Sequence, residues 1–325
     1  MQIFKCPTCG KDVFFSNLNC ACGRAVMFDP IRQVFDADKP TCANRDAIGC
    51  NWRAMDGSDY CRSCNMTKII PDTFHSDNVD LWRDAERAKR WVLANLARWG
   101  WFTGPDLSLA PDFHLLAEET RAGPSNVIMG HAEGLITINV AEADPTERIK
   151  RREDLGERLR TMIAHFRHEI AHFLFLRLAR SPQFHSSFRE LFGNETIDYP
   201  QALSTYYENG APEDYAERYV TRYASSHPHE DWAETAAHLM HLTDILDSAQ
   251  STGLIPENSG KHGPTAYDDP DGESVVDRAL SLGLGLNHIN RSMGLDDVYP
   301  FVTRPLVRRK LIFAHGWISK GPPPG

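Results

Sequence analysis

Residues 165–174 read His-Phe-Arg-His-Glu-Ile-Ala-His-Phe-Leu, and this stretch decides what we expect of the fold. It holds the pattern H-E-x-x-H at His168, Glu169 and His172, inside a helix that we predict from about residue 153 to 179. Positions i and i+4 share one helix face, so the two histidines can bind one metal ion. Glu169 lies beside them, where it can hold and deprotonate a metal-bound water. The pattern predicts a zinc-dependent hydrolase, most simply a peptidase.

Composition limits the class of protein. With 325 residues the chain has room for two domains and a sizeable core. Its 42% apolar and 24% charged residues are typical of a soluble globular protein. No window approaches the roughly 18 uninterrupted apolar residues of a membrane span, and the first residues lack the basic and apolar regions of a secretory signal. We therefore expect a cytoplasmic protein with no membrane partner.

The charge of the chain is unevenly distributed. The net charge of −9 divides into +2 over residues 1–70 and −11 over the remainder. The acidic bulk argues against a large nucleic-acid-binding surface, although a small basic patch on the first segment stays compatible with it. We expect a peptide or protein substrate for the acidic part and a protein partner, if any, for the N-terminal part.

All cysteines of the chain lie within its first 64 residues, and their spacing is typical of zinc ligands. We predict two structural zinc sites, one made by Cys6, Cys9, Cys20 and Cys22 and the other by Cys42, Cys50, Cys61 and Cys64. An interleaved pairing of the same ligands is also possible. Four disulfides fit poorly, because no secretory signal precedes the cysteines. Closed four-cysteine sites fold small domains and do no chemistry. The expected core around them comprises Phe14, Phe15, Phe28, Phe35 and Trp52.

A catalytic zinc ion needs three protein ligands and an open position for water. The helix predicted from Pro228 to about Asp247 carries Glu230 and Glu234, which are i, i+4 and can face one site. Burying two carboxylates is costly unless cations receive them, as a zinc ion and its histidines would. The spacing does not choose between the two glutamates. Other candidate ligands are Asp198, His227, His229 and His238.

The pattern H-E-x-x-H followed by Glu230-x-x-x-Glu234 resembles that of the gluzincins. In that group the first carboxylate ligates zinc and the second hydrogen-bonds a ligand histidine, so the resemblance implies Glu230 as the third ligand and Glu234 as the residue that orients His168 or His172. As in some gluzincins, a tyrosine lies seven residues before the presumed ligand, which implies Tyr223 as the donor to the oxyanion. The competing tyrosines are Tyr206, Tyr207 and Tyr219. Over most of its length the chain also resembles a bacterial family described as zinc-binding metallopeptidases with an N-terminal zinc ribbon.

Together these observations predict an α+β protein with a boundary near Pro71-Asp72-Thr73. Residues 1–70 are expected to form a zinc-ribbon-like module. The resemblance implies a mostly helical, zincin-like metallopeptidase domain with a small antiparallel sheet over residues 71–325. A helix is predicted over 76–99. Residues 127–129 and 135–140 are expected to form a hairpin, with 135–140 either as the edge strand that pairs with substrate or as an ordinary strand.

The predicted function is hydrolysis of peptide bonds, with Glu169 as the general base. Tyr223 and Glu234 would support the reaction, and the chain would bind one catalytic and two structural zinc ions. Two other functions remain open. The protein could be a zinc-ribbon module that binds a protein or nucleic acid and carries an idle hydrolase domain. It could also hydrolyse amides other than peptides.

Overall fold

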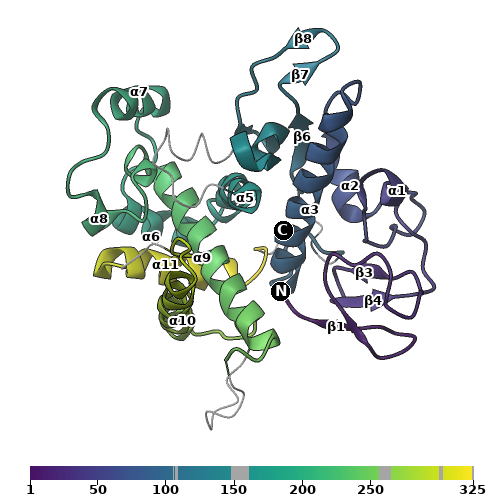
Figure 1. The fold of residues 1–325 in the computed structure, drawn as a ribbon. Coiled ribbons are helices and arrows are strands. Elements are labelled where there is room, and N and C mark those ends of the chain that lie inside the picture. Colours follow the sequence, from purple (N-terminus) through teal and green to yellow (C-terminus); the bar gives the residue numbers. More distant parts are fainter. Residues whose placement is uncertain (105, 107–108, 148–160, 256–264, 300–302, 324–325) are drawn as a thin grey trace. The chain divides into compact units, whose positions relative to one another are not determined.

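The computed structural model describes residues 1–104, 106, 109–147, 161–255, 265–299 and 303–323 (Figure 1). The chain divides into two compact units, residues 1–166 and residues 167–324, and the division falls within helix α5 (Met162–Leu178). The predicted boundary at residue 70 therefore lies inside the first unit. The first part of the helix predicted from residue 153 lies outside the described residues. Among the described residues, no helix has the length and apolar character needed to cross a membrane.

The N-terminal part of the first unit consists of two short antiparallel pairs and two short helices. Strand β1 (Phe4–Lys5) pairs with β2 (Asp12–Val13), and β3 (Met27–Asp29) pairs with β4 (Val34–Asp36). The helices are α1 (Arg45–Ile48) and α2 (Arg62–Met66). The predicted core is correct for its members Phe15, Phe28, Phe35 and Trp52, which are buried. It is wrong for Phe14, which is 56% exposed, because the chain turns at residues 14–17 and directs Phe15 inward instead.

Helix α3 (Ser76–Arg98) begins and ends within one residue of the predicted bounds. Its apolar face buries Trp82, Val92, Leu93 and Leu96, as a helical period requires. The same helix buries Glu86, Lys89 and Arg90, which the sequence pattern did not predict. Lys89 Nζ lies 2.8 Å from Glu86 Oε1 and also donates to Thr67 Oγ1. Buried charges of this kind are tolerated because they are paired.

A four-stranded sheet completes the first unit, in the order β5-β6-β10-β9. The strands are β5 (Thr67–Ile69), β6 (Asp112–Leu116), β9 (Gly130–Ala132) and β10 (Leu135–Asn139). The predicted hairpin is confirmed, with a two-residue turn at Glu133 (φ 47°) and Gly134 (φ 93°). Its first strand is 130–132 rather than 127–129. A smaller pair, β7 (Glu119–Thr120) and β8 (Gly123–Pro124), lies between β6 and β9 in the sequence.

The position of β10 corrects one expectation. Strand β10 pairs with β6 in parallel and with β9 in antiparallel orientation, so both of its edges are occupied. Residues 135–140 are therefore not an edge strand that could pair with substrate. The sheet is mixed, since β5 also pairs with β6 in parallel, whereas only the antiparallel hairpin was expected. Parallel strands are joined by long connections rather than by a short turn, so the local sequence does not predict which strands pair. A short 3-10 helix, η1 (Val140–Ala143), follows β10.

The second unit is helical. It consists of the remainder of α5, followed by α6 (Pro182–Phe192), α7 (Tyr199–Asn209), α8 (Tyr215–Arg218), the 3-10 helix η2 (Tyr223–Ser225), α9 (Pro228–Ser251), α10 (Gly272–Ser292) and α11 (Pro305–Ile318). Helix α9 begins at Pro228 as predicted and extends one turn beyond Asp247. Helices α6, α10 and α11 and the turn η2 all pack against α9 (Figure 1).

Aromatic side chains form the centre of this helical unit. Trp232 on α9 is fully buried, and its ring contacts Phe184 and Phe188 on α6 at centroid distances of 5.4 and 6.4 Å. Trp232 Nε1 donates to the backbone oxygen of Ala171 on α5, 2.9 Å away. This bond fixes α9 against the helix segment that carries the two histidines. The α+β class, mostly helical with small sheets, is thus confirmed.

Candidate active site

Helix α5 places His168 and His172 on one face, one turn apart. His172 is buried and the ring of His168 is largely covered, with 16% of its side chain exposed. The ring centroids lie 4.8 Å apart, and the two Nε2 atoms lie 3.1 Å apart. The apolar neighbours Ile170, Ala171 and Phe173 are all buried, so the pair lies in a region of low dielectric. Such a pair of converging ring nitrogens is the geometry of two ligands for one ion.

Helix α9 brings Glu230 to these nitrogens. His227 caps the helix through Nδ1, which accepts from the backbone N–H of His229, so Glu230 lies in the first turn. Glu230 Oε2 lies 3.1 Å from His168 Nε2, and Oε1 lies 3.4 Å from His172 Nε2. Ligands about 2.0–2.1 Å from a tetrahedral zinc ion are about 3.3 Å from one another. The three side chains therefore have the mutual spacing of zinc ligands, although Glu230 is 62 residues from His168 in the sequence.

Glu234, one turn further along α9, contacts the other side of His168. Its Oε1 accepts from His168 Nδ1 at 2.7 Å, and its Oε2 accepts from Thr221 Oγ1 at 2.7 Å. A carboxylate can only accept, so His168 carries its proton on Nδ1 and, when neutral, presents a lone pair at Nε2. This is the tautomer that a metal ligand needs. The two glutamates therefore have different positions. Glu230 faces the Nε2 atoms of both histidines, and Glu234 contacts Nδ1 of His168 on the opposite side of its ring.

The electrostatics of the site are those of a cation-binding cluster. Burial lowers the pKa of His168, but hydrogen bonds and charge from Glu230 and Glu234 outweigh it and hold the pKa well above its usual value. Burial raises the pKa of Glu230, yet the charge of His172 and the bond to His168 hold it well below the ordinary range. Glu230 Oε2 is buried and lies against His168 Nε2, 3.1 Å away. Two anionic carboxylates face imidazoles here, so a divalent cation fits the donor set.

Two further predicted residues lie beside this group. Glu169 is 8% exposed, and one of its carboxylate oxygens lies within 4.8 Å of a ring nitrogen of His172. Tyr223 begins η2, and its ring centroid lies 6.1 Å from that of His168. Burial, followed by the charge of Glu230, raises the pKa of Tyr223. Its phenol therefore stays protonated and is available as a neutral hydrogen-bond donor.

The competing candidates have other contacts. Asp198 caps α7 by accepting from the backbone N–H of Gln201 at 2.8 Å. His227 Nε2 lies 3.2 Å from the backbone oxygen of Ile197, and His238 Nδ1 lies 2.8 Å from Tyr299 Oη. The ring of His229 packs on Phe175 with a centroid distance of 4.7 Å. None of these side chains belongs to a cluster of potential metal ligands within the described residues.

The competing tyrosines also have other surroundings. Tyr207 is 68% exposed, and Tyr219 lies under Lys310, whose Nζ is 4.7 Å from the ring centroid. Tyr206 packs edge-on against Tyr223 at 5.8 Å. Tyr223, by contrast, has its ring beside that of the candidate ligand His168.

The structure adds two residues that the sequence pattern did not predict. Thr221 reaches Glu234, as described above, and Tyr199 Oη donates to Glu230 Oε1 at 2.7 Å. Neither residue has a fixed spacing from the H-E-x-x-H pattern. The only available signal for Tyr199 was its place directly after Asp198, a strong helix-capping residue.

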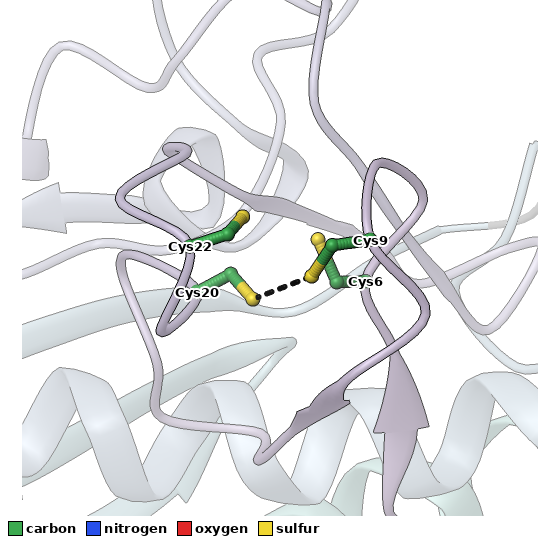
Figure 2. A group of neighbouring side chains, drawn as sticks. All are labelled: Cys6, Cys9, Cys20 and Cys22. Carbon is green, nitrogen blue, oxygen red and sulfur yellow. Dashed lines mark hydrogen bonds between the residues drawn. The ribbon is translucent and has the colours of Figure 1, made fainter.

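The first four-cysteine cluster joins two loops of the N-terminal part (Figure 2). All four Sγ atoms of Cys6, Cys9, Cys20 and Cys22 lie within 4.8 Å of one another, and Cys9 and Cys20 are 3.5 Å apart. Gly10 and Gly23 follow the two pairs with φ of 71° and 84°, the left-handed region that glycine adopts without strain. Sulfurs about 3.8 Å apart fit a shared zinc ion, and a disulfide would need about 2.05 Å. Cys9 and Cys22 are exposed.

The second cluster, formed by Cys42, Cys50, Cys61 and Cys64, is buried throughout. Cys50 Sγ lies 3.6 Å from Cys61 Sγ and 3.8 Å from Cys64 Sγ. The cysteines therefore group consecutively rather than interleaved. Arg90 of α3 lies beside this cluster. Burial lowers the pKa of Arg90, and negative charge on Cys50, Glu86 and Cys64 more than offsets that effect.

The position of Glu234 leads to a prediction about metal affinity. We expect Glu234→Gln to weaken zinc binding at this site by about 10–100-fold, because His168 loses the charged acceptor that fixes its tautomer and ring orientation. The measurement is zinc competition against a chromophoric chelator. Glu213→Gln, at an exposed position in the same unit, is the matched control and should bind as the unsubstituted protein does. Equal zinc affinity in Glu234→Gln and Glu213→Gln would show that Glu234 does not contribute to metal binding.

Comparisons with known proteins show what the two parts of the chain are similar to. Residues 78–317 match the model of a family described as "putative zinc-binding metallo-peptidase", and residues 3–75 match that of a zinc-ribbon domain. The uncharacterized proteins Rv2568c of Mycobacterium tuberculosis and Mb2598c of Mycobacterium bovis are each 38% identical to this chain over 341 residues, which covers 99% of the chain and 97% of each relative. No solved structure matches.

Proposed function

Because the chain belongs to the family of zinc-binding metallopeptidases with an N-terminal zinc ribbon, we propose that it is a zinc-dependent peptidase whose centre consists of His168, His172 and Glu230. One observation carries the proposal. Two imidazole nitrogens and one carboxylate, from helices far apart in the sequence, lie 3.1–3.4 Å from one another in a buried region. Such convergence is costly unless a cation occupies the space between the three groups.

A zinc ion held there would act as a Lewis acid on the scissile carbonyl and lower the pKa of a bound water toward about 7. The side chains supply the remaining functions. Glu169 takes the proton of the attacking water and delivers it to the leaving amine nitrogen. Tyr223, which stays protonated, donates a hydrogen bond to the oxyanion of the tetrahedral intermediate. Glu234 and Thr221 keep His168 in the tautomer that ligates through Nε2.

The two four-cysteine clusters are proposed to bind structural zinc, which gives three zinc ions per chain with the catalytic one. These cysteine sites have a full set of protein ligands and leave no position for substrate. Their role is to fold residues 1–70 around a small aromatic core. The substrate is proposed to be a peptide or protein.

The test combines metal content with cleavage of a mixed peptide library. We expect three zinc ions in the unsubstituted protein and two in His168→Ala, with peptide cleavage lost in that variant. A chelator should abolish cleavage, and added zinc should restore it. Two zinc ions in both proteins would overturn the proposal and favour a ribbon module with an idle hydrolase domain. Three zinc ions without peptide cleavage, but with hydrolysis of other amides, would overturn the substrate class alone.

A further inference from the structure

The two oxygens of Glu230 have different surroundings. Oε1 accepts the hydrogen bond from Tyr199 Oη at 2.7 Å. Oε1 also lies 3.4 Å from His172 Nε2, and the buried Oε2 lies 3.1 Å from His168 Nε2. A carboxylate without this difference could offer both oxygens to a metal ion. Here each oxygen lies next to a ligand nitrogen, but a phenol engages only Oε1.

Tyr199 is itself held in place from two directions. It is the first residue of α7, which Asp198 caps through the backbone N–H of Gln201. Its ring packs edge-on against His227 with a centroid distance of 5.0 Å. The ring of His227 is fixed in turn, because Nδ1 accepts from His229 N–H and Nε2 meets the backbone oxygen of Ile197. These contacts restrict the Tyr199 side chain to a rotamer that directs its hydroxyl group toward Glu230.

The phenol of Tyr199 can only donate to this carboxylate. Its Oη lies 2.7 Å from Glu230 Oε1, and an ionised carboxylate oxygen can only accept, so the phenol supplies the proton of this bond. A neutral O–H donor facing an ionised carboxylate forms a strong, short hydrogen bond. Competition between this bond and a metal ion for the same oxygen is the basis of the inference.

We propose that Tyr199 is a positioning residue that makes Glu230 a ligand through Oε2 alone. The inference rests on the proposed zinc centre and adds to it the reason why a coordination position stays open. A catalytic zinc needs three protein donor atoms and a free position for water and substrate. If Glu230 gave both oxygens, it would occupy that position itself. Tyr199 prevents this by retaining Oε1.

The experiment removes only the phenol oxygen, with Tyr199→Phe, and replaces the catalytic zinc with cobalt(II). Cobalt(II) absorbs visible light strongly when four-coordinate and more weakly when its coordination number rises. We expect the variant to show a weaker and shifted visible band than the unsubstituted protein and a kcat reduced at least 10-fold with a smaller change in KM. Its zinc affinity should fall by about 100-fold at most, which is the upper end of the effect seen when a residue that hydrogen-bonds a metal ligand is replaced.

Tyr215→Phe is the matched control, since it removes a phenol from α8 and should leave the cobalt spectrum unchanged. A spectrum of Tyr199→Phe identical to that of the control would overturn the inference. Absence of any catalytic metal in the unsubstituted protein would instead overturn the proposed function, so the two failures are distinguishable.

A second variant, Asp198→Ala, serves if Tyr199→Phe does not fold. It keeps the phenol but removes the side chain that caps α7, so it should shift the same visible band in the same direction by a smaller amount. No shift in that variant would count against the inference.

Discussion

Glu169→Gln is expected to lower the rate of peptide cleavage by about 10²–10⁴-fold while the protein keeps its full zinc content. The amide has nearly the same size and shape as the carboxylate but cannot accept a proton from water at neutral pH. Glu169 lies within 4.8 Å of His172 and is not among the three groups that converge at 3.1–3.4 Å. Its loss should therefore affect the chemical step and leave the metal in place.

The measurement is kcat/KM on a peptide substrate together with zinc stoichiometry on the same sample. Glu217→Gln, an exposed position whose carboxylate meets Arg304 at 3.2 Å, controls for the loss of one negative charge from the helical unit. Full cleavage activity in Glu169→Gln would exclude the residue as general base. Loss of one zinc ion would show that it is a ligand instead.

Cys50→Ser is expected to destabilise residues 1–70 more than the loss of an exposed cysteine from the first cluster does. Cys50 is fully buried, with two further thiols of its cluster at 3.6 and 3.8 Å. Binding of zinc to small four-ligand sites contributes on the order of 10 kcal/mol to folding, and serine is a poor ligand. The variant would also leave Arg90 buried without part of its counter-charge.

This prediction is tested by zinc stoichiometry and thermal unfolding, with Cys9→Ser as the comparison. Cys9 is exposed, so its replacement leaves a site that water can reach and complete. We expect Cys50→Ser to lose one zinc ion and to unfold around residues 42–66, as limited proteolysis would detect. Cys9→Ser should weaken its site with a smaller fall in Tm. A larger effect from Cys9→Ser would mean that the first cluster, not the second, stabilises this part.

The features that could be predicted from the sequence are those encoded over short distances. The apolar period placed α3 to within a residue, Pro228 placed the start of α9, and the i, i+4 spacing brought His168 and His172 together. The exposure of Phe14 was missed because a turn of a few residues decides which of two adjacent phenylalanines faces inward.

Other features depend on packing between distant segments. The parallel pairing of β10 with β6, the link from Thr221 to Glu234 and the bond from Tyr199 to Glu230 join residues with no periodic relationship. The choice between Glu230 and Glu234 was likewise open, because both lie on one face of the same helix. It is the position of α9 against α5, fixed in part by Trp232, that gives them different neighbours.

Helix α7 buries none of its residues, and yet its first side chain holds a carboxylate of the proposed metal centre. A helix with so little buried surface has a low free energy of local opening. Each opening withdraws the phenol from Glu230, so metal binding and the order of α7 are thermodynamically linked. Metal bound at Glu230 should slow amide hydrogen exchange in α7, and a peptide that packs on α7 should slow the release of the metal.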